Sequence, residues 1–463
     1  MLGQGAGRNV VRRAIAKYLQ QMNPAMIVIC SYLIADLLGT LLLSLDISLV
    51  GERISMIDAF FTSTSALCVT GLTVVDTGTT FTVFGQSVIL ALMQIGGLGV
   101  MTFSVLFFLF LGRGFSTRGR WIINESFTAA PVRSASSLLR SIFLFTVLAE
   151  AVGALLLTIE WRSELGMSSA LFAGVFHAVS AFCNAGLALF ETSFVEYRGN
   201  VMVNVVICSL IVLGGIGFPV IYEFMTRLRR VRAHARTAVS LHSRTVLVTT
   251  AVLILSGAVL VFALEQNNEI ADLSTREQVL ASLFQSITAR TAGFNTLDIG
   301  SLTVATLFIL VILMFVGASP GSCGGGIKTT SLVVLIAILN DRIRGRHSAS
   351  IFKRKLPDES VSKALSIFIL AVIAVTVGIV LLLITQAVPS RESFLTYVFE
   401  AVSAFGTVGL SMGVTPALTV IGRLVIIALM LLGRVGLLTV AYVVTSRRIA
   451  SPYQYAEEKI MIG

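Results

Sequence analysis

The chain alternates between long apolar runs and shorter polar segments. Four runs are close to the roughly 20 residues that cross a hydrocarbon core of about 30 Å, and they cover residues 26–45, 141–159, 246–264 and 364–384. Four further runs lie at residues 82–112, 203–225, 302–339 and 418–444. This pattern predicts an all-α integral membrane protein with eight transmembrane helices.

The charged residues indicate how these helices are oriented. Basic residues gather before the first run, after the last run and in alternate connections, at residues 113–140, 227–244 and 342–363. The opposite connections are acidic or nearly neutral, so the positive-inside rule predicts that both termini are cytoplasmic. The chain is 56% apolar and only 13% charged, against about 45–50% and about 25% in soluble domains. We therefore attribute the net charge of +10 to the membrane-flanking loops and expect no nucleic-acid partner.

Four short segments between the runs resemble one another. Each starts with Phe and reaches Gly nine or ten residues later: Phe61-TSTSALCVT-Gly71, Phe176-HAVSAFCNA-Gly186, Phe284-QSITARTA-Gly293 and Phe399-EAVSAFGTV-Gly409. Such segments are too short to span a bilayer and suit re-entrant half-helices. Because irregular backbone at membrane depth must be buried in protein or line a watery cavity, the four loops are predicted to surround one pseudo-four-fold pore.

The repeats define the predicted organisation. A cytoplasmic segment covers residues 1–23, the four span–pore-helix–span repeats cover 24–112, 138–232, 244–346 and 361–446, and a cytoplasmic tail covers 447–463. A second similarity lies 24–28 residues after each loop glycine, where Gly96, Gly214, Gly317 and Gly433 begin small-residue clusters. Small residues allow close helix packing, so these clusters are expected to pack each second span behind its loop.

The four loops have the composition of an ion filter. A permeating cation exchanges its water shell for protein oxygens, which a ring of backbone carbonyls can supply. Glycine adopts the required backbone without steric penalty, and the preceding half-helix turns its negative dipole end toward the ion. The alternative, that each glycine merely turns a buried hairpin, is weakened by the four-fold repetition. The predicted filter residues are Val69, Thr70, Gly71, Asn184, Ala185, Gly186, Thr291, Ala292, Gly293, Thr407, Val408 and Gly409.

The run 317–328 interrupts the second span of the third repeat. One proline and several glycines there cannot sustain a regular helix, and the run is no phosphate-binding loop because Ile327 separates Gly326 from Lys328. It is either a packed kink or an intramembrane gate, and we favour the gate. Deleting the segment between Ala318 and Ile327 should then raise ion flux. The predicted gate residues are Gly317, Ser319, Pro320, Gly321, Gly324, Gly325, Gly326, Lys328 and Arg434.

Ionisable residues inside apolar spans are costly and usually face the interior of the bundle. Arg434 is either a positive barrier paired with the Gly-rich loop or an anchor on buried carbonyls. Arg290 is expected to brace a neighbouring loop, and Asp36 and Glu150 to be hydrogen-bonded carboxyls, with a coupling-ion site as the alternative.

Other candidate groups do not form a catalytic or metal-binding cluster in the sequence. His177 is expected to be a satisfied buried imidazole. Asp58 and Glu400, on the half-helices, attract cations or pair with an arginine. The remaining histidines are scattered, so a membrane enzyme is disfavoured, and the five cysteines have no paired spacing.

Several stretches resemble the TrkH/KtrB/HKT superfamily of ion transporters. They are SALCVTGLTVVDTG (65–78), SAFCNAGLALF (180–190), TARTAGFNTLD (288–298), SAFGTVGL (403–410), LMQIGGLGVMT (92–102), GGGIKTT (324–330) and LLGRVGLLTVAY (431–442). Eight spans and a short N-terminus resemble the KtrB branch of Ktr-type potassium uptake systems, since the TrkH branch has ten spans.

The resemblance implies a potassium-translocating subunit of the bacterial cytoplasmic membrane, with K⁺ in the filter. It also implies a homodimer surrounded by lipid, and a cytoplasmic KtrA-type ring that binds ATP or ADP, while this chain itself binds no nucleotide. All-glycine filters in the family go with potassium preference, and some Ktr systems require Na⁺ as an activating or coupling ion. A sodium-permeable or sodium-coupled transporter is the alternative.

Overall fold

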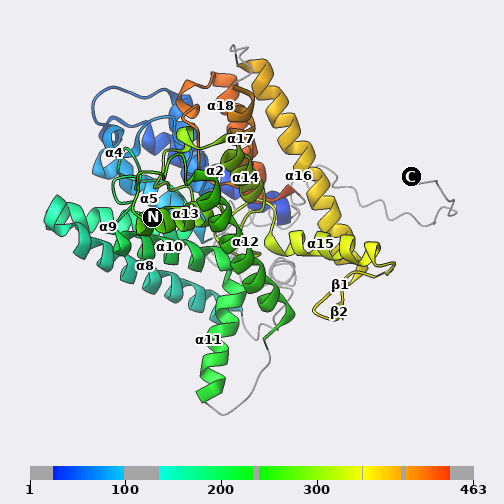
Figure 1. Ribbon diagram of the computed structural model, residues 1–463. Helices are drawn as coiled ribbons and strands as arrows, with labels where there is room; N and C mark the ends of the chain where they lie inside the picture. The colour runs from blue at the N-terminus through cyan, green and yellow to red at the C-terminus, as the bar shows by residue number, and fades with distance from the viewer. Residues whose placement is uncertain (1–23, 99–134, 233–238, 347, 387–392, 438–463) are drawn as a thin grey trace, which may run out of the picture.

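The computed structural model describes residues 24–98, 135–232, 239–346, 348–386 and 393–437. The two predicted cytoplasmic end segments, and residues 99–112 and 438–446 of the first and fourth repeats, lie outside this part of the chain. The described residues are mostly helical (Figure 1). A short antiparallel hairpin of β1 (Ser350–Ile351) and β2 (Arg354–Lys355) follows the third group of helices.

The helices fall into four groups in chain order. The first contains α2 (Pro24–Leu43), α3 (Met56–Leu67), α4 (Thr77–Thr80) and α5 (Val83–Gly97), and the second α8 (Ala135–Leu165), α9 (Met167–Cys183), α10 (Val201–Ile216) and α11 (Phe218–Arg232). The third contains α12 (Leu241–Glu265), α13 (Thr275–Thr288), α14 (Val304–Phe315) and α15 (Thr329–Ile343), and the fourth α16 (Asp358–Thr385), α17 (Ser393–Gly406) and α18 (Val420–Val435). Short 3₁₀ turns lie at Asp46–Ser48, Ile299–Ser301 and Thr415–Ala417.

Three described helices are long and apolar enough to cross a membrane: Arg140–Leu165, Leu241–Glu265 and Asp358–Thr385. A fourth span is present if α10 and the start of α11 are taken together, although these helices are bent by 95°. The apolar run over residues 203–225 is therefore not one straight helix, because the chain turns at Gly217, whose φ is +98°. The membrane class agrees with the structure, and the count of eight spans stays a prediction.

The helix that follows each half-helix begins with the same local signal. The side chains of Thr82, Asn200, Thr303 and Thr419 precede α5, α10, α14 and α18, and each accepts a hydrogen bond from the backbone N–H three residues later. Such caps satisfy N–H groups that have no partner within the helix. Four equivalent caps make the four groups start their returning helices alike.

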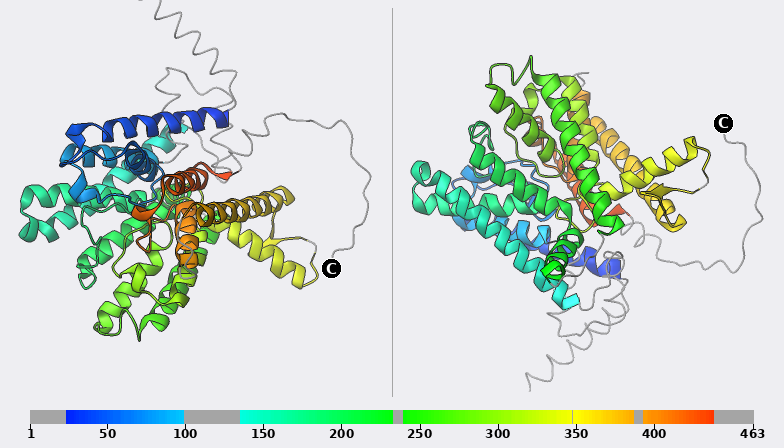
Figure 2. Two further views of the ribbon diagram at one scale, coloured as in Figure 1. Left: turned by 90° about the horizontal axis from the view of Figure 1, so that it is seen from above. Right: turned by 60° about the horizontal axis from the view of Figure 1, so that its bottom comes forward.

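The half-helices join the groups into a ring. Each of α3, α9, α13 and α17 contacts the returning helix of the preceding group, which is α18, α5, α10 and α14 respectively. Because α3 of the first group meets α18 of the last, the arrangement closes on itself. The left view of Figure 2 shows the groups lying around a common centre in chain order. Phe61, Phe176, Phe284 and Phe399, which open the four repeated segments, are all buried.

Candidate functional site

The four loops after the half-helices share an unusual backbone. Val69, Asn184, Thr291 and Thr407 have φ of +57°, +60°, +70° and +50°. Two residues later, Gly71, Gly186, Gly293 and Gly409 have φ of +93°, +68°, +84° and +93°. A non-glycine residue in this region costs of order 1–3 kcal/mol and is typical of functional sites. The same strain at four equivalent positions confirms that the sequence repeat is a structural repeat.

The four glycines form a closed ring. A Cβ atom built on Gly71 would lie 2.5 Å from the carbonyl oxygen of Ala185, and one on Gly186 would lie 2.6 Å from that of Ala292. The next contact runs from Gly293 to the carbonyl oxygen of Val408, at 2.5 Å. The ring closes where Gly409 meets the carbonyl oxygen of Thr70. Each glycine thus packs against the carbonyl that precedes the glycine of the next loop, and no larger residue fits without movement.

The third loop reaches the same geometry with one residue fewer. Three loops close with a hydrogen bond to the carbonyl five residues earlier: Thr70 to Ser65, Ala185 to Ser180 and Val408 to Ser403, at 2.7–2.9 Å. In the third loop the equivalent bond runs from Ala292 N to Thr288 O, four residues earlier, at 2.9 Å. The third loop is therefore one residue shorter in this turn, while Thr291 and Gly293 keep the same backbone conformation as their counterparts in the other loops.

The hydroxyl groups at the base of these turns were missed as functional residues by the sequence analysis. Ser65 and Ser403 accept hydrogen bonds from the N–H of Gly71 and Gly409, each at 3.1 Å. In the other two loops, Ser180 and Thr288 donate to the carbonyls that follow the glycine, at 2.8 and 2.6 Å. The signal was a Ser or Thr at nearly the same offset before each glycine. These groups hold the glycine backbone in position.

The glycines of the returning helices pack behind the loops, as predicted, in three of the four groups. A Cβ atom on Gly96, Gly214 or Gly433 would collide with the last carbonyls of the half-helices, at Leu67, Phe182 and Phe405. In the third group, Gly317 instead packs against the carbonyl of Gly325. The third group therefore departs from the pattern at the start of its Gly-rich loop.

That Gly-rich loop, residues 317–328, separates α14 from α15 and lies against two of the four ring loops. Gly325 N donates to Thr407 Oγ1 at 3.0 Å, and a Cβ atom on Gly324 would strike the side chain of Thr291. Lys328 Nζ turns back and donates to Gly324 O at 2.7 Å. Two of the predicted gate residues, Gly324 and Gly325, are thus adjacent to the ring loops.

The ends of this loop lie side by side, since Val316 and Ile327 form a parallel bridge. Thr329, the first residue of α15, donates from Oγ1 to Ser319 Oγ of the loop at 3.1 Å. Gly321 and Gly326 have φ of +68° and +67°. The structure places these residues, with Pro320, in a folded non-helical segment, as predicted.

Arg434, on α18 of the fourth group, also holds this loop in place. Its side chain, 9% exposed, donates to Cys323 O of the loop and to Gly96 O of the first group. The expected pairing with the Gly-rich loop is therefore confirmed. The second bond also agrees with the anchor alternative, so one buried cation links three groups of the ring.

The remaining predicted ionisable groups have different surroundings. Asp36 Oδ2 accepts from Thr64 at 2.8 Å, whereas Oδ1 has no partner among the described residues. Glu150 Oε1 lies 4.0 Å from Cys183 Sγ. Arg290 is buried, and its Nε has no hydrogen-bond partner in the part of the chain that the structure describes. The hydrogen-bonded brace predicted for Arg290 is thus not found at this atom.

On the half-helices, Asp58 does pair with an arginine, which is Arg423 of α18. Glu400 accepts from Ser411 at 2.8 Å and from Thr415. His177 is a satisfied buried imidazole, as expected: Nε2 accepts from Leu189 N at 3.1 Å, and Nδ1 lies 2.8 Å from Ala173 O.

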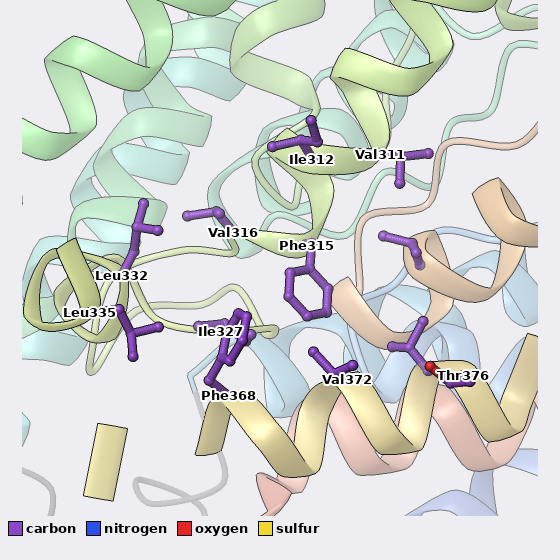
Figure 3. A pocket seen from close by; sticks show the side chains of 12 residues that line it. Val311, Ile312, Phe315, Val316, Ile327, Leu332, Leu335, Phe368, Val372 and Thr376 are labelled. Carbon is purple, nitrogen blue, oxygen red and sulfur yellow. The ribbon is translucent and has the colours of Figure 1, made fainter. Parts of the chain in front are cut away.

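An apolar pocket of about 380 Å³ lies beside the Gly-rich loop (Figure 3). Val316 and Ile327, which flank the loop, form part of its wall, with side chains from α14, α15, α16 and α17. Thr376 has the one polar side chain in this lining. Such a pocket lacks the oxygens that replace an ion's hydration shell, so the ring carbonyls are the better candidates for ion contact. Among the described residues, no group of three or more His, Cys, Asp or Glu could hold a metal ion.

The chain is similar in sequence to known ion uptake proteins. The chain is 41% identical to the Ktr system potassium uptake protein B of Bacillus subtilis, over 91% of this chain and 93% of that protein. It is 36% identical to the potassium/sodium uptake protein NtpJ of Enterococcus hirae, over 96% of this chain and 98% of that protein.

A solved structure has the same fold. The potassium transporter TrkH from Vibrio parahaemolyticus superposes with a TM-score of 0.70 at 18% identity, covering 92% of this chain and 86% of that chain. Residues 6–454 match the family TrkH, described as cation transport protein. The resemblance seen in the loop sequences is therefore confirmed, and the chain belongs to the TrkH family of cation transport proteins.

Proposed function

We propose that this chain is the potassium-translocating subunit of a Ktr-type uptake system and that K⁺ passes through the four loops. The observation that carries the proposal is the closed ring of four left-handed glycines, each packed against a carbonyl of the next loop. Backbone carbonyls replace the hydration shell of K⁺ in known filters. The predicted filter residues contain no carboxylate, which suits a monovalent ion better than a divalent one.

The membrane arrangement belongs to the same proposal. Eight spans in four repeats cross the bacterial cytoplasmic membrane, with both termini in the cytoplasm. The membrane potential drives K⁺ inward with about 2.3 kcal/mol per charge for each 100 mV. The Gly-rich loop and Arg434 form the gate, because they lie against the loops and carry buried positive charge.

The assembly is also proposed from the relatives. Ktr system proteins B and D are named as parts of a multi-component system. We expect a homodimer and a cytoplasmic nucleotide-binding ring of the KtrA type, which would supply the nucleotide control.

Sodium permeation or sodium coupling is the second candidate. It is favoured by one observation, the 36% identity to a protein named as a potassium/sodium uptake protein. Both candidates use the same ring and differ in ion preference.

The test is ion flux into liposomes that contain only the purified chain, under an inside-negative potential. We expect rubidium uptake that is blocked by excess external K⁺ and little reduced by equal Na⁺. Equal competition by Na⁺ would select the second candidate. Absence of any cation flux, from protein shown to be folded and inserted, would overturn both. The same measurement with the cytoplasmic partner tests the regulation.

A further inference from the structure

The returning helix of the second group breaks at a glycine with positive φ, as α18 does at Gly436, where φ is +92°. Helix α10 ends at Ile216, Gly217 takes φ of +98°, and α11 starts at Phe218 with a bend of 95°. In a straight α-helix, Phe218 N would donate to Gly214 O, four residues earlier. Pro219 has no N–H and hinders the straight form. The bend therefore leaves a donor and an acceptor free at adjacent helix ends.

The Gly-rich loop of the third group takes up both free groups. Phe218 N donates to Gly321 O at 2.9 Å, and Gly214 O accepts from Cys323 N at 3.1 Å. The loop thus bonds to the donor and to the acceptor that would bond to each other in a straight helix.

A third bond extends this contact. Gly215 O, whose helical donor would be the missing N–H of Pro219, accepts from Ser319 N at 3.1 Å. A Cβ atom on Gly217 would lie 2.5 Å from Pro320 O. The loop and the bend are therefore in close backbone contact along the loop's first half.

We infer that residues 214–218 form a latch that holds the Gly-rich loop in its seat beside the filter, and that straightening of the α10–α11 bend releases it. The two arrangements exclude each other, because the single N–H of Phe218 can donate either to Gly214 O or to Gly321 O of the loop. Two discrete arrangements of one element are what a switch requires. The inference rests on the proposed function, since it makes the second repeat a positioning part of the gate in the third.

The experiment measures rubidium flux into liposomes for variants of the latch. Gly217→Ala introduces a Cβ against Pro320 O and favours the straight helix, so we expect flux to rise about fivefold or more. The matched control is Gly51→Ala, because Gly51 has a similar φ of +94° with nothing within 4 Å of its Cβ position. Selectivity for K⁺ over Na⁺ should stay at the parent value in both.

A second pair isolates the hydrogen bond should Gly217→Ala fail to fold. Phe218→Pro and Phe218→Ala both remove the ring, but only proline removes the N–H that bonds to Gly321 O. Proline is tolerated in the first turn of a helix. Proline also hinders the straight helix, so this pair tests the hold on the loop and not the straightening. We expect higher flux from Phe218→Pro than from Phe218→Ala, because only proline removes the loop's bond at Gly321 O.

Deletion of residues 318–326 separates this inference from the proposed gate. The paired ends at Val316 and Ile327 allow the chain to be rejoined. We expect the deletion to raise flux and to abolish any further effect of Gly217→Ala. No rise in the deletion variant would overturn the gate itself. A rise there, without one in the latch variants or with an additional one from Gly217→Ala, would overturn the latch.

Discussion

The ring of four loops and the ends of the returning helices differ in how closely the four groups repeat one another. In the ring, the four loops repeat the same pair of left-handed residues, although one has lost a residue. Where the returning helices end, the repetition is weaker. Helices α10 and α18 both end before a glycine with positive φ, Gly217 and Gly436, whereas α14 is followed by the Gly-rich loop and only α18 among these three carries an arginine, Arg434, at this place. Equivalent oxygens around an ion require near-symmetry, whereas a gate needs one element that can move alone. The same repeat unit has been kept in the ring and altered beneath it.

The largest effect is expected from breaking the ring. Gly293→Ala places a Cβ 2.5 Å from Val408 O at a residue with φ of +84°. Because neither backbone can yield without disturbing the ring, we expect rubidium flux to fall roughly a hundredfold. Gly413→Ala is the control, with φ of +85° and open space around its Cβ position. Normal flux and selectivity in Gly293→Ala would refute the assignment of the ring as the filter.

An intermediate effect is expected from Arg434→Ala, which changes the contact between α18 and the Gly-rich loop. The variant removes a buried charge and two hydrogen bonds, to Cys323 O and Gly96 O. Charged hydrogen bonds contribute about 1.5–3 kcal/mol each, so flux should rise roughly tenfold while selectivity is kept. Arg423→Ala is the matched control on the same helix, because Arg423 pairs with Asp58 instead. Loss of folded protein in gel filtration, confined to Arg434→Ala, would support the anchor and contradict the barrier.

The smallest effect is expected at the contact between the fourth ring loop and the Gly-rich loop. Thr407→Val removes the hydroxyl that accepts from Gly325 N at 3.0 Å. A neutral hydrogen bond contributes about 1 kcal/mol, so flux should rise roughly fivefold. Thr250→Val makes the same change at a buried hydroxyl with no partner in the described residues, and it should leave flux unchanged. Equal fluxes in the two variants would show that this contact does not hold the loop.

The ring of four loops was predictable from the sequence, whereas the ends of the returning helices were predictable only in part. Four similar Phe-to-Gly segments were enough to expect four equivalent loops, because local backbone requirements leave a trace at each glycine. The bend at Gly217 was missed although Pro219 is visible, since hydropathy averages over residues 203–225 and is blind to φ. The sequence analysis expected Arg434 to pair with the Gly-rich loop, but its second hydrogen bond, to Gly96 O, could not be derived, because that acceptor lies 338 residues away along the chain. Arg290 was expected to bond to a neighbour, and burial alone did not provide one for its Nε.

The bend at Gly217 also has a mechanical consequence. Helix α11 has 15 residues and is therefore about 22 Å long; Figure 1 shows it projecting from the body of the protein. If the bend straightens as inferred above, α11 acts as a lever arm with its fulcrum at Gly217. A tilt of about 10° swings its basic far end by about 4 Å, while its first turn moves by a few tenths of an ångström. A weak force that moves the far end of α11 by several ångströms would therefore act on the loop contacts at residues 214–218 as a larger force over a smaller distance.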